Sequence, residues 1–219
     1  MNQPAFPYVI PFAAFFFFLA LEGQFKLDPA WEYPLRALLL AAILWVFSRH
    51  VISFRLARPA GSFLLGVAVF VLWVGPDLIA PGYRQHWLFS NSILGAAPTP
   101  QDGYQTLSAV ALWSRVIRAV VLVPIIEELF WRAWLMRWLI KPDFQSIPLG
   151  AYAPQAFAIT AALFAIEHGG FWLVGLIAGI LYNWWMVRTR SLGDCILAHG
   201  VTNALLCGYV LAAGKWEYW

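Results

Sequence analysis

Long apolar segments follow one another along this chain and constrain its fold more than any other feature. A transmembrane helix needs about 20 mostly apolar residues, and the joints between these segments are polar or rich in Pro and Gly. We predict spans over residues 4–21, 34–48, 61–80, 107–140, 154–168, 171–187 and 195–213. The first segment lacks a basic leading region and an obvious cleavage site, so we expect a retained span rather than a signal peptide.

The low charge content argues against a water-soluble globular protein. Charged residues make up 11% of the chain and hydrophobic residues 62%, whereas a soluble domain carries about 25% charged residues. The Arg and Lys residues lie between apolar runs, where they face lipid headgroups or fix topology, and they do not indicate nucleic-acid binding. We predict an all-α, polytopic transmembrane helical bundle. Residues 1–219 would form a single integral membrane domain, with the catalytic motifs within 124–213.

The fourth segment is too long for one upright span. Residues 107–140 would extend roughly 51 Å at 1.5 Å per residue, against a hydrocarbon core of about 30 Å. Pro124 removes a backbone donor near its middle, so we expect a kinked or broken helix there and seven or eight spans in total. Arg115 and Arg118 also fall in this segment, and we expect them to snorkel or pair within the bundle rather than touch a substrate.

The same segment carries the first group of ionisable residues that an apolar span should not contain. Such groups are costly in the hydrocarbon region and usually mark function. Glu128 and Arg132 stand four residues apart, so their side chains can meet on one helix face and neutralise each other. Glu127 points about 100° away from Glu128. One carboxylate thus has an internal partner, and Glu127 is left for another role.

Two further groups interrupt later apolar runs. Glu167 and His168 end one segment directly before two glycines, and His199 and Asn203 stand four residues apart on one helix face. A carboxylate with an imidazole can take a proton from water and aim the resulting nucleophile. A His and an Asn side by side can donate hydrogen bonds to the oxyanion of a tetrahedral intermediate. Together these residue types suit amide hydrolysis.

The three groups, in this order, resemble the CPBP family of intramembrane proteases, which includes the type II CAAX prenyl endopeptidases. The family pattern is a Glu–Glu pair with Arg four residues after the second Glu, then Phe-x-x-x-His, then His-x-x-x-Asn. This sequence has EELFWR at 127–132, FAIEH at 164–168 and HGVTN at 199–203. The resemblance implies a glutamic-type intramembrane endopeptidase that acts on a peptide or membrane-protein substrate in the lipid bilayer.

The resemblance also implies roles for individual residues. Glu127 and His168 would activate the attacking water, and His199 and Asn203 would stabilise the oxyanion. No catalytic metal and no other cofactor is implied.

Three more residues would support this site. The resemblance implies that Glu128 and Arg132 form a supporting ion pair. Glu167 is either a partner of His168 or a surface carboxylate at the end of the span, and the sequence favours neither interpretation.

A narrower resemblance concerns the details EELFWR, AIEHGG and the Arg-Thr-Arg-Ser loop before the last His. These are similar to the CAAX-protease-related proteins of bacterial exosortase systems. Trp131 and Ala133 flank Arg132 here, where many family members have Phe-Arg-Gly. The narrower resemblance implies a bacterial inner (cytoplasmic) membrane and exosortase-system proteins as partners, and it argues against a prenylated substrate.

Two alternative functions would use the same residues. A metal-dependent membrane hydrolase could bind zinc through Glu127, His168 and His199, since zinc accepts such nitrogen and oxygen donors, although the sequence contains no HExxH motif. A non-catalytic membrane scaffold or a proton-coupled carrier could instead use the Glu and His residues as partner contacts or as a proton relay.

Overall fold

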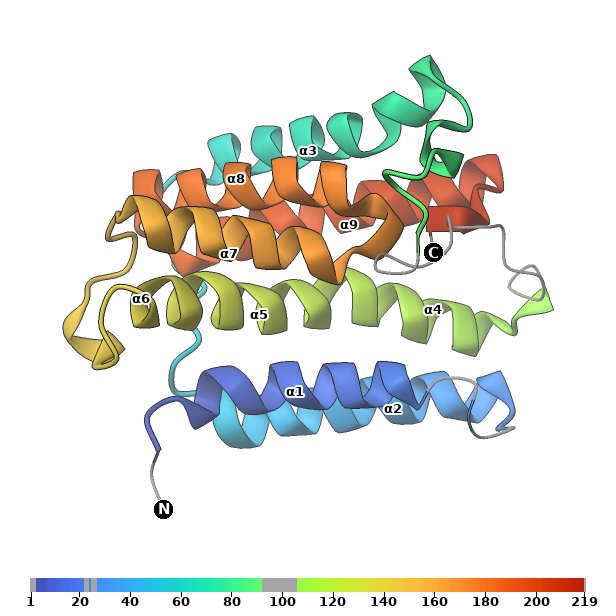
Figure 1. The fold of residues 1–219 in the computed structure, drawn as a ribbon. Coiled ribbons are helices and arrows are strands. Elements are labelled where there is room, and N and C mark those ends of the chain that lie inside the picture. Colours follow the sequence, from blue (N-terminus) through green and yellow to red (C-terminus); the bar gives the residue numbers. More distant parts are fainter. Residues whose placement is uncertain (1–2, 22–23, 25–26, 92–105, 219) are drawn as a thin grey trace.

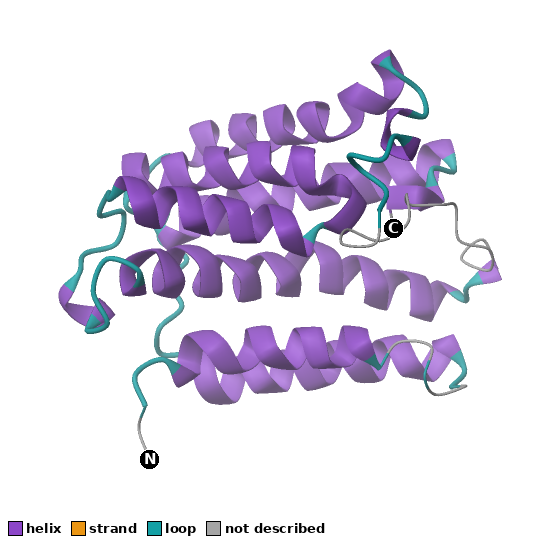
Figure 2. Ribbon diagram, in the orientation of Figure 1, coloured by secondary structure: helices purple, strands orange, loops and turns teal. Residues whose placement is uncertain are grey.

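The computed structural model describes residues 3–21, 24, 27–91 and 106–218. These residues form helices connected by loops (Figure 2), which confirms the predicted all-α bundle. Each predicted span coincides with one helix. Outside the fourth segment these helices are α1 (Phe6–Ala20), α2 (Pro29–Ile43), α3 (Pro59–Ile79), α7 (Pro154–Glu167), α8 (Trp172–Thr189) and α9 (Leu192–Ala213).

The fourth segment is one continuous helix of 30 residues, Ala109–Trp138. Its regular parts are α4 (Ala109–Ile117), α5 (Val123–Glu128) and α6 (Met136–Trp138). Two π-helical stretches, Arg118–Leu122 and Leu129–Leu135, join them. The helix is therefore irregular next to Pro124, but it is not broken into two spans, because the wider π turn accommodates the missing N–H of proline.

The helices give the protein several membrane-spanning elements. Among the described residues, five helices are long and apolar enough to cross a bilayer, and α1 and α7 are shorter apolar helices. The chain is thus a multi-pass integral membrane protein. The exact number of spans, seven or eight, stays a prediction.

The long helix runs through the middle of the bundle (Figure 1). Helices α1 and α2 lie side by side against one side of it, and α3, α7, α8 and α9 lie on the other side. Helix α3 packs along α9, and α7 packs along α8. The long helix therefore contacts both groups and brings its own side chains against α7 and α9.

A glycine allows α3 to approach α9 closely. A Cβ atom added at Gly66 would lie 2.5 Å from the carbonyl oxygen of Ala198. Small residues of this kind let membrane helices pack backbone to backbone. The Thr202 hydroxyl lies 2.9 Å from the carbonyl oxygen of Gly66 and joins the two helices further.

Asp194 fixes the start of α9 to the loop before α3. This buried carboxylate accepts hydrogen bonds from the backbone N–H groups of Ala57 and Arg58 and from the Ser62 hydroxyl, at 3.0–3.1 Å. Ser191 caps the same helix by accepting from the N–H of Asp194. Satisfying these buried groups sets the position of α9, which carries two of the predicted site residues.

Candidate active site

Pro124 and Asn203 together shape the contact between the long helix and α9. In a π turn the carbonyl of residue i accepts from the N–H of residue i+5, and Val123 donates to Arg118 in this way. The next carbonyl in that pattern, Ala119, would need an N–H from Pro124, which has none. The side-chain amide of Asn203 donates to Ala119 O instead, over 2.8 Å. This uses one of the two amide N–H bonds of Asn203.

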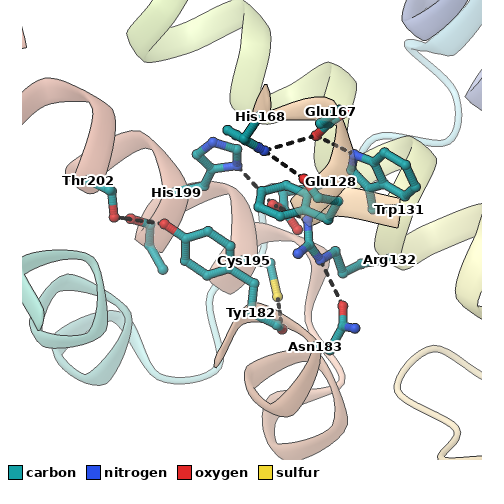
Figure 3. Close-up of polar contacts among 12 residues, drawn as sticks. Glu128, Trp131, Arg132, Glu167, His168, Tyr182, Asn183, Cys195, His199 and Thr202 are labelled. Atoms are coloured by element: carbon teal, nitrogen blue, oxygen red, sulfur yellow. Dashed lines mark hydrogen bonds and ion pairs between the residues drawn. The ribbon is translucent and has the colours of Figure 1, made fainter. Parts of the chain in front are cut away.

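Glu128 lies at the centre of a cluster of buried polar and charged side chains. Its Oε1 atom accepts a hydrogen bond from Nη1 of Arg132 at 3.1 Å, which is the pair that the sequence predicts. Nδ1 of His199 lies 2.9 Å from the same oxygen. Glu128 therefore binds two donors from two helices, as Figure 3 shows, and it links the first motif to the third.

Arg132 is fully buried, and its surroundings offset the cost of removing its charge from water. Its Nε donates to Oδ1 of Asn183 at 3.1 Å. Its guanidinium carbon lies 4.4 Å from the centre of the Phe164 ring and 5.4 Å from that of Tyr182. A buried cation needs such partners. Arg132 is thus a rigid support behind Glu128, held by α7 and α8.

His199 is held from two sides. Its ring stacks on Tyr182, with centroids 5.2 Å apart and an angle of 20° between the planes. The Tyr182 hydroxyl lies 2.7 Å from Oγ1 of Thr202, which fixes the tyrosine in turn. Because Nδ1 of His199 binds Glu128, its Nε2 is the nitrogen left for other groups.

Glu127 lies beside the residues of the second motif. A carboxylate oxygen of Glu127, a carboxylate oxygen of Glu167 and a ring nitrogen of His168 all lie within 4.8 Å of one another. Trp131 donates its Nε1–H to Oε1 of Glu167 at 3.1 Å. The Oε2 atoms of Glu127 and Glu167 are buried and have no hydrogen-bond partner among the described residues. The Glu167 carboxylate therefore lies next to Glu127 and His168 with its Oε2 atom buried, although the residue as a whole is partly exposed.

The His168 ring is oriented by its own helix. Its Nδ1 lies 2.6 Å from the carbonyl oxygen of Phe164, and a carbonyl can only accept, so Nδ1 carries the hydrogen. In the neutral ring Nε2 is then free of hydrogen and can accept a proton or a hydrogen bond. The ring also packs edge-on against Trp73, with centroids 5.2 Å apart.

The short length of α7 brings His168 to the depth of Glu127. The helix has 14 residues, or about 21 Å, which is less than the roughly 30 Å of a hydrocarbon core. The turn after it lies well inside the bundle, because α3, α4 and α9 extend beyond that turn (Figure 1). A residue at the end of one helix can therefore meet a residue in the middle of another.

All four residues predicted to be catalytic line one cavity of about 350 Å³. This volume falls in the range of small-ligand sites. Carboxylate, imidazole and amide groups come from the long helix, α7 and α9, and apolar side chains form much of the remaining wall. The lining includes Glu127, His168, His199, Asn203, Phe15, Leu19, Trp73, Tyr182, Leu206, Val210, Arg115, Arg118, Glu217 and Tyr218.

The residues that could hold a metal differ from those of the zinc hypothesis. Glu127, Glu167 and His168 are close enough to share an ion. His199, the third zinc ligand in that hypothesis, is not part of this group, and Glu167 takes its place. A cation or a shared proton would offset the repulsion between the two neighbouring carboxylates.

Sequence reasoning missed the residues that support the site from α8. Tyr182 stacks on His199, and Asn183 binds Arg132. A signal was present, since an Asn inside an apolar span needs a partner. The sequence does not state which partner that is.

Comparison with known protein families finds a match to part of this chain. The model of a family described as type II CAAX prenyl endopeptidase Rce1-like matches residues 109–205, a range that contains all three motifs. This match confirms the resemblance drawn from the sequence. Searches of the curated proteins and of the solved structures found no match.

Proposed function

We propose that this multi-pass membrane protein, whose residues 109–205 match the model of the Rce1-like type II CAAX prenyl endopeptidase family, hydrolyses a peptide bond with water activated by Glu127 and His168. The observation that carries this proposal is the common cavity, which is lined by both residues together with His199 and Asn203.

In the proposed reaction Glu127 is the general base. Its buried Oε2 lacks a partner among the described residues, so the O–H of a water would satisfy it. Glu127 takes a proton from the water as the water oxygen attacks the carbonyl carbon of the substrate. Nε2 of His168 accepts a hydrogen bond from the second O–H of this water and so orients the lone pair of the water oxygen toward the carbonyl carbon. The C–N bond then breaks as its nitrogen receives the proton from Glu127.

His199 and Asn203 are the proposed oxyanion donors. Asn203 has one amide N–H that is not used by Ala119. Nδ1 of His199 lies against the Glu128 carboxylate, which can only accept, so Nε2 donates to the oxyanion when the ring carries a hydrogen on both nitrogens. Donors fixed in a water-poor site before the reaction stabilise a developing oxyanion strongly.

The remaining residues hold these groups in place. Arg132 balances Glu128, and Glu167 lies next to both Glu127 and His168. No step of the proposed mechanism uses a metal, because water activation and oxyanion stabilisation both have protein groups assigned to them.

The substrate of this proposed enzyme is a peptide or a membrane protein. The narrower sequence resemblance leads us to propose the bacterial inner membrane as its location and exosortase-system proteins as its partners. These are inferences from EELFWR, AIEHGG and the Arg-rich loop rather than from the cavity.

A cleavage assay on the purified protein tests the proposal. A pool of synthetic peptides, free and lipid-anchored, is incubated with the protein in lipid nanodiscs, and products are identified by mass spectrometry. We expect products with the unmodified protein and none with Glu127→Gln. The exposed loop residue Asp143 provides a matched control, since Asp143→Asn makes the same acid-to-amide change away from the cavity. Cleavage that survives Glu127→Gln in a folded protein would reject the assignment.

A further inference from the structure

Exposed basic side chains gather at one end of the bundle. Among the described residues seven Lys and Arg residues are exposed, and six of them lie at the end where α3 and α9 begin. The seventh, Lys215, lies at the opposite end, and its Nζ atom is 3.7 Å from Oε1 of Glu217. The end with six exposed cations is called the basic end, and its residues are Arg49, Arg55, Arg58, Lys141, Arg188 and Arg190.

Contacts between the loops hold these residues together at the basic end. The Ser191 hydroxyl donates to the carbonyl oxygen of Arg55 at 2.8 Å. A Cβ atom added at Gly150 would lie 2.9 Å from Cγ of Arg190. The path of the chain agrees, because α1, α3, α7 and α9 begin at this end, and α2, the long helix and α8 end there (Figure 1).

The cavity lies in the half of the bundle away from the basic end. Its lining residues on the long helix lie between 115 and 127, and those on α9 lie between 199 and 210. The long helix ends at the basic end and α9 begins there, so both ranges leave out the part of the helix next to that end. Phe15, Leu19 and Trp73 of the lining also come from the later parts of α1 and α3, which end on the opposite side.

A layer of close-packed residues separates the cavity from the basic end. Glu128 and Arg132 on the long helix, Met186 on α8 and Cys195 on α9 are 0% exposed. None of these four residues is part of the cavity lining. In the other direction the cavity reaches the protein surface, because its lining includes Leu19, which is 37% exposed. Packing therefore blocks entry from the basic end and leaves the opposite half open.

The basic end also indicates how the protein is inserted in the membrane. Cytoplasmic loops of membrane proteins carry an excess of Lys and Arg, and the anionic lipids of the cytoplasmic leaflet attract exposed cations. At the opposite end Arg84 is buried and pairs with Asp77. Arg36 is likewise buried and pairs with Glu32. The six exposed cations therefore favour the basic end on the cytoplasmic side.

We propose that the basic end faces the cytoplasm and that the substrate enters the cavity from the non-cytoplasmic side of the membrane. This inference rests on the proposed function, because it concerns the substrate of that hydrolysis. It assigns a substrate class, namely a polypeptide segment that has already crossed the membrane. A translocation step must therefore precede hydrolysis, and a polypeptide that stays in the cytoplasm is not a substrate.

Two matched cysteine substitutions test which end faces the cytoplasm. Both native cysteines are first replaced by Ala, and Gln85→Cys and Gln145→Cys are then introduced separately. Both sites are exposed, Gln85 in the loop after α3 and Gln145 in the loop that contains Lys141. Spheroplasts of a bacterial host that express each variant are treated with a membrane-impermeant maleimide. We expect full labelling of Gln85→Cys without lysis, and labelling of Gln145→Cys only after lysis.

A second matched pair tests entry into the cavity itself. Leu206 lines the cavity, whereas Leu135 on the long helix is buried outside the lining. A small charged thiosulfonate should react with Leu206→Cys in intact spheroplasts, and should not react with Leu135→Cys from either side. Unlabelled cytoplasmic thiols in the same sample verify that the spheroplasts are intact. Thermal unfolding in detergent verifies that each variant is folded.

Three results would overturn the inference: labelling of Gln145→Cys in intact spheroplasts, labelling of Gln85→Cys only after lysis, or reaction of Leu206→Cys only after lysis. None of these measurements depends on cleavage. Failure of the proposed hydrolysis would appear separately, as absence of cleavage products with the unmodified protein.

Discussion

Nδ1 of His199 lies 2.9 Å from Oε1 of Glu128, the same oxygen that accepts a hydrogen bond from Arg132. Both glutamates have a buried Oε2 without a partner among the described residues, but Glu127 lines the cavity, whereas Glu128 is fully buried with its Oε1 bound to Arg132 and His199. Two adjacent glutamates thus differ in their environment. This difference explains why we assign structural support to one and proton transfer to the other.

Replacing Glu128 by Gln should destabilise the protein strongly. The change leaves the buried Arg132 without a countercharge, and breaking a buried ion pair costs about 3–5 kcal/mol. Unfolding by denaturant in detergent measures the loss. Asp143→Asn, at an exposed site, should stay within about 0.5 kcal/mol of the unmodified protein. A similarly small effect of Glu128→Gln would show that the ion pair does not support the site.

Asn203→Ala should reduce stability by an amount that depends on Pro124. The substitution leaves Ala119 O without its donor, which costs about 1–3 kcal/mol. Pro124→Ala restores a backbone N–H for that carbonyl, so the loss should be smaller in that background. A double-mutant cycle of unfolding free energies measures the coupling. Equal losses in both backgrounds would contradict this account of the π turn.

Chelation separates the proposed mechanism from the metal alternative. We expect peptide cleavage to be unchanged by a strong chelator, and purified protein to contain no stoichiometric zinc. In the metal alternative, Glu127, Glu167 and His168 would be the ligands. Activity would then fall on chelation and return with zinc, and Glu167→Gln would lower the zinc content.

The turn after α9 provides a test of pH dependence outside the spans. The Tyr218 hydroxyl donates to the Asp77 carboxylate, and burial raises the pKa of Tyr218 from 10.0 to about 12. Folding therefore favours the neutral phenol, and its contribution to stability is complete below about pH 10 and lost as the pH rises toward 12. The difference in near-ultraviolet absorbance between unmodified and Tyr218→Phe protein follows this titration. A midpoint at the ordinary tyrosine value would contradict the buried contact.

The sequence predicts those parts of the fold and of the site that depend on residues close together in the chain. Apolar segments of span length predict each helix, and the i,i+4 spacing predicts the pair of Glu128 and Arg132. The third partner, His199, cannot be predicted in this way, because residues 71 positions apart meet only through the packing of the long helix on α9. Of the two alternatives predicted near Pro124, a kinked or a broken helix, the continuous helix excludes the break, because a π turn and the amide of Asn203 compensate for the missing N–H.

Paired substitution of Glu127 and His168 tests the central claim most directly, since the account has both side chains acting on one water. Each single variant, Glu127→Gln or His168→Ala, should lower kcat for peptide cleavage by about 10²- to 10⁴-fold. The double variant should be no slower than the slower single variant, because residues that act as a unit are not additive. Losses that multiply, or a single variant with undiminished kcat, would contradict the account.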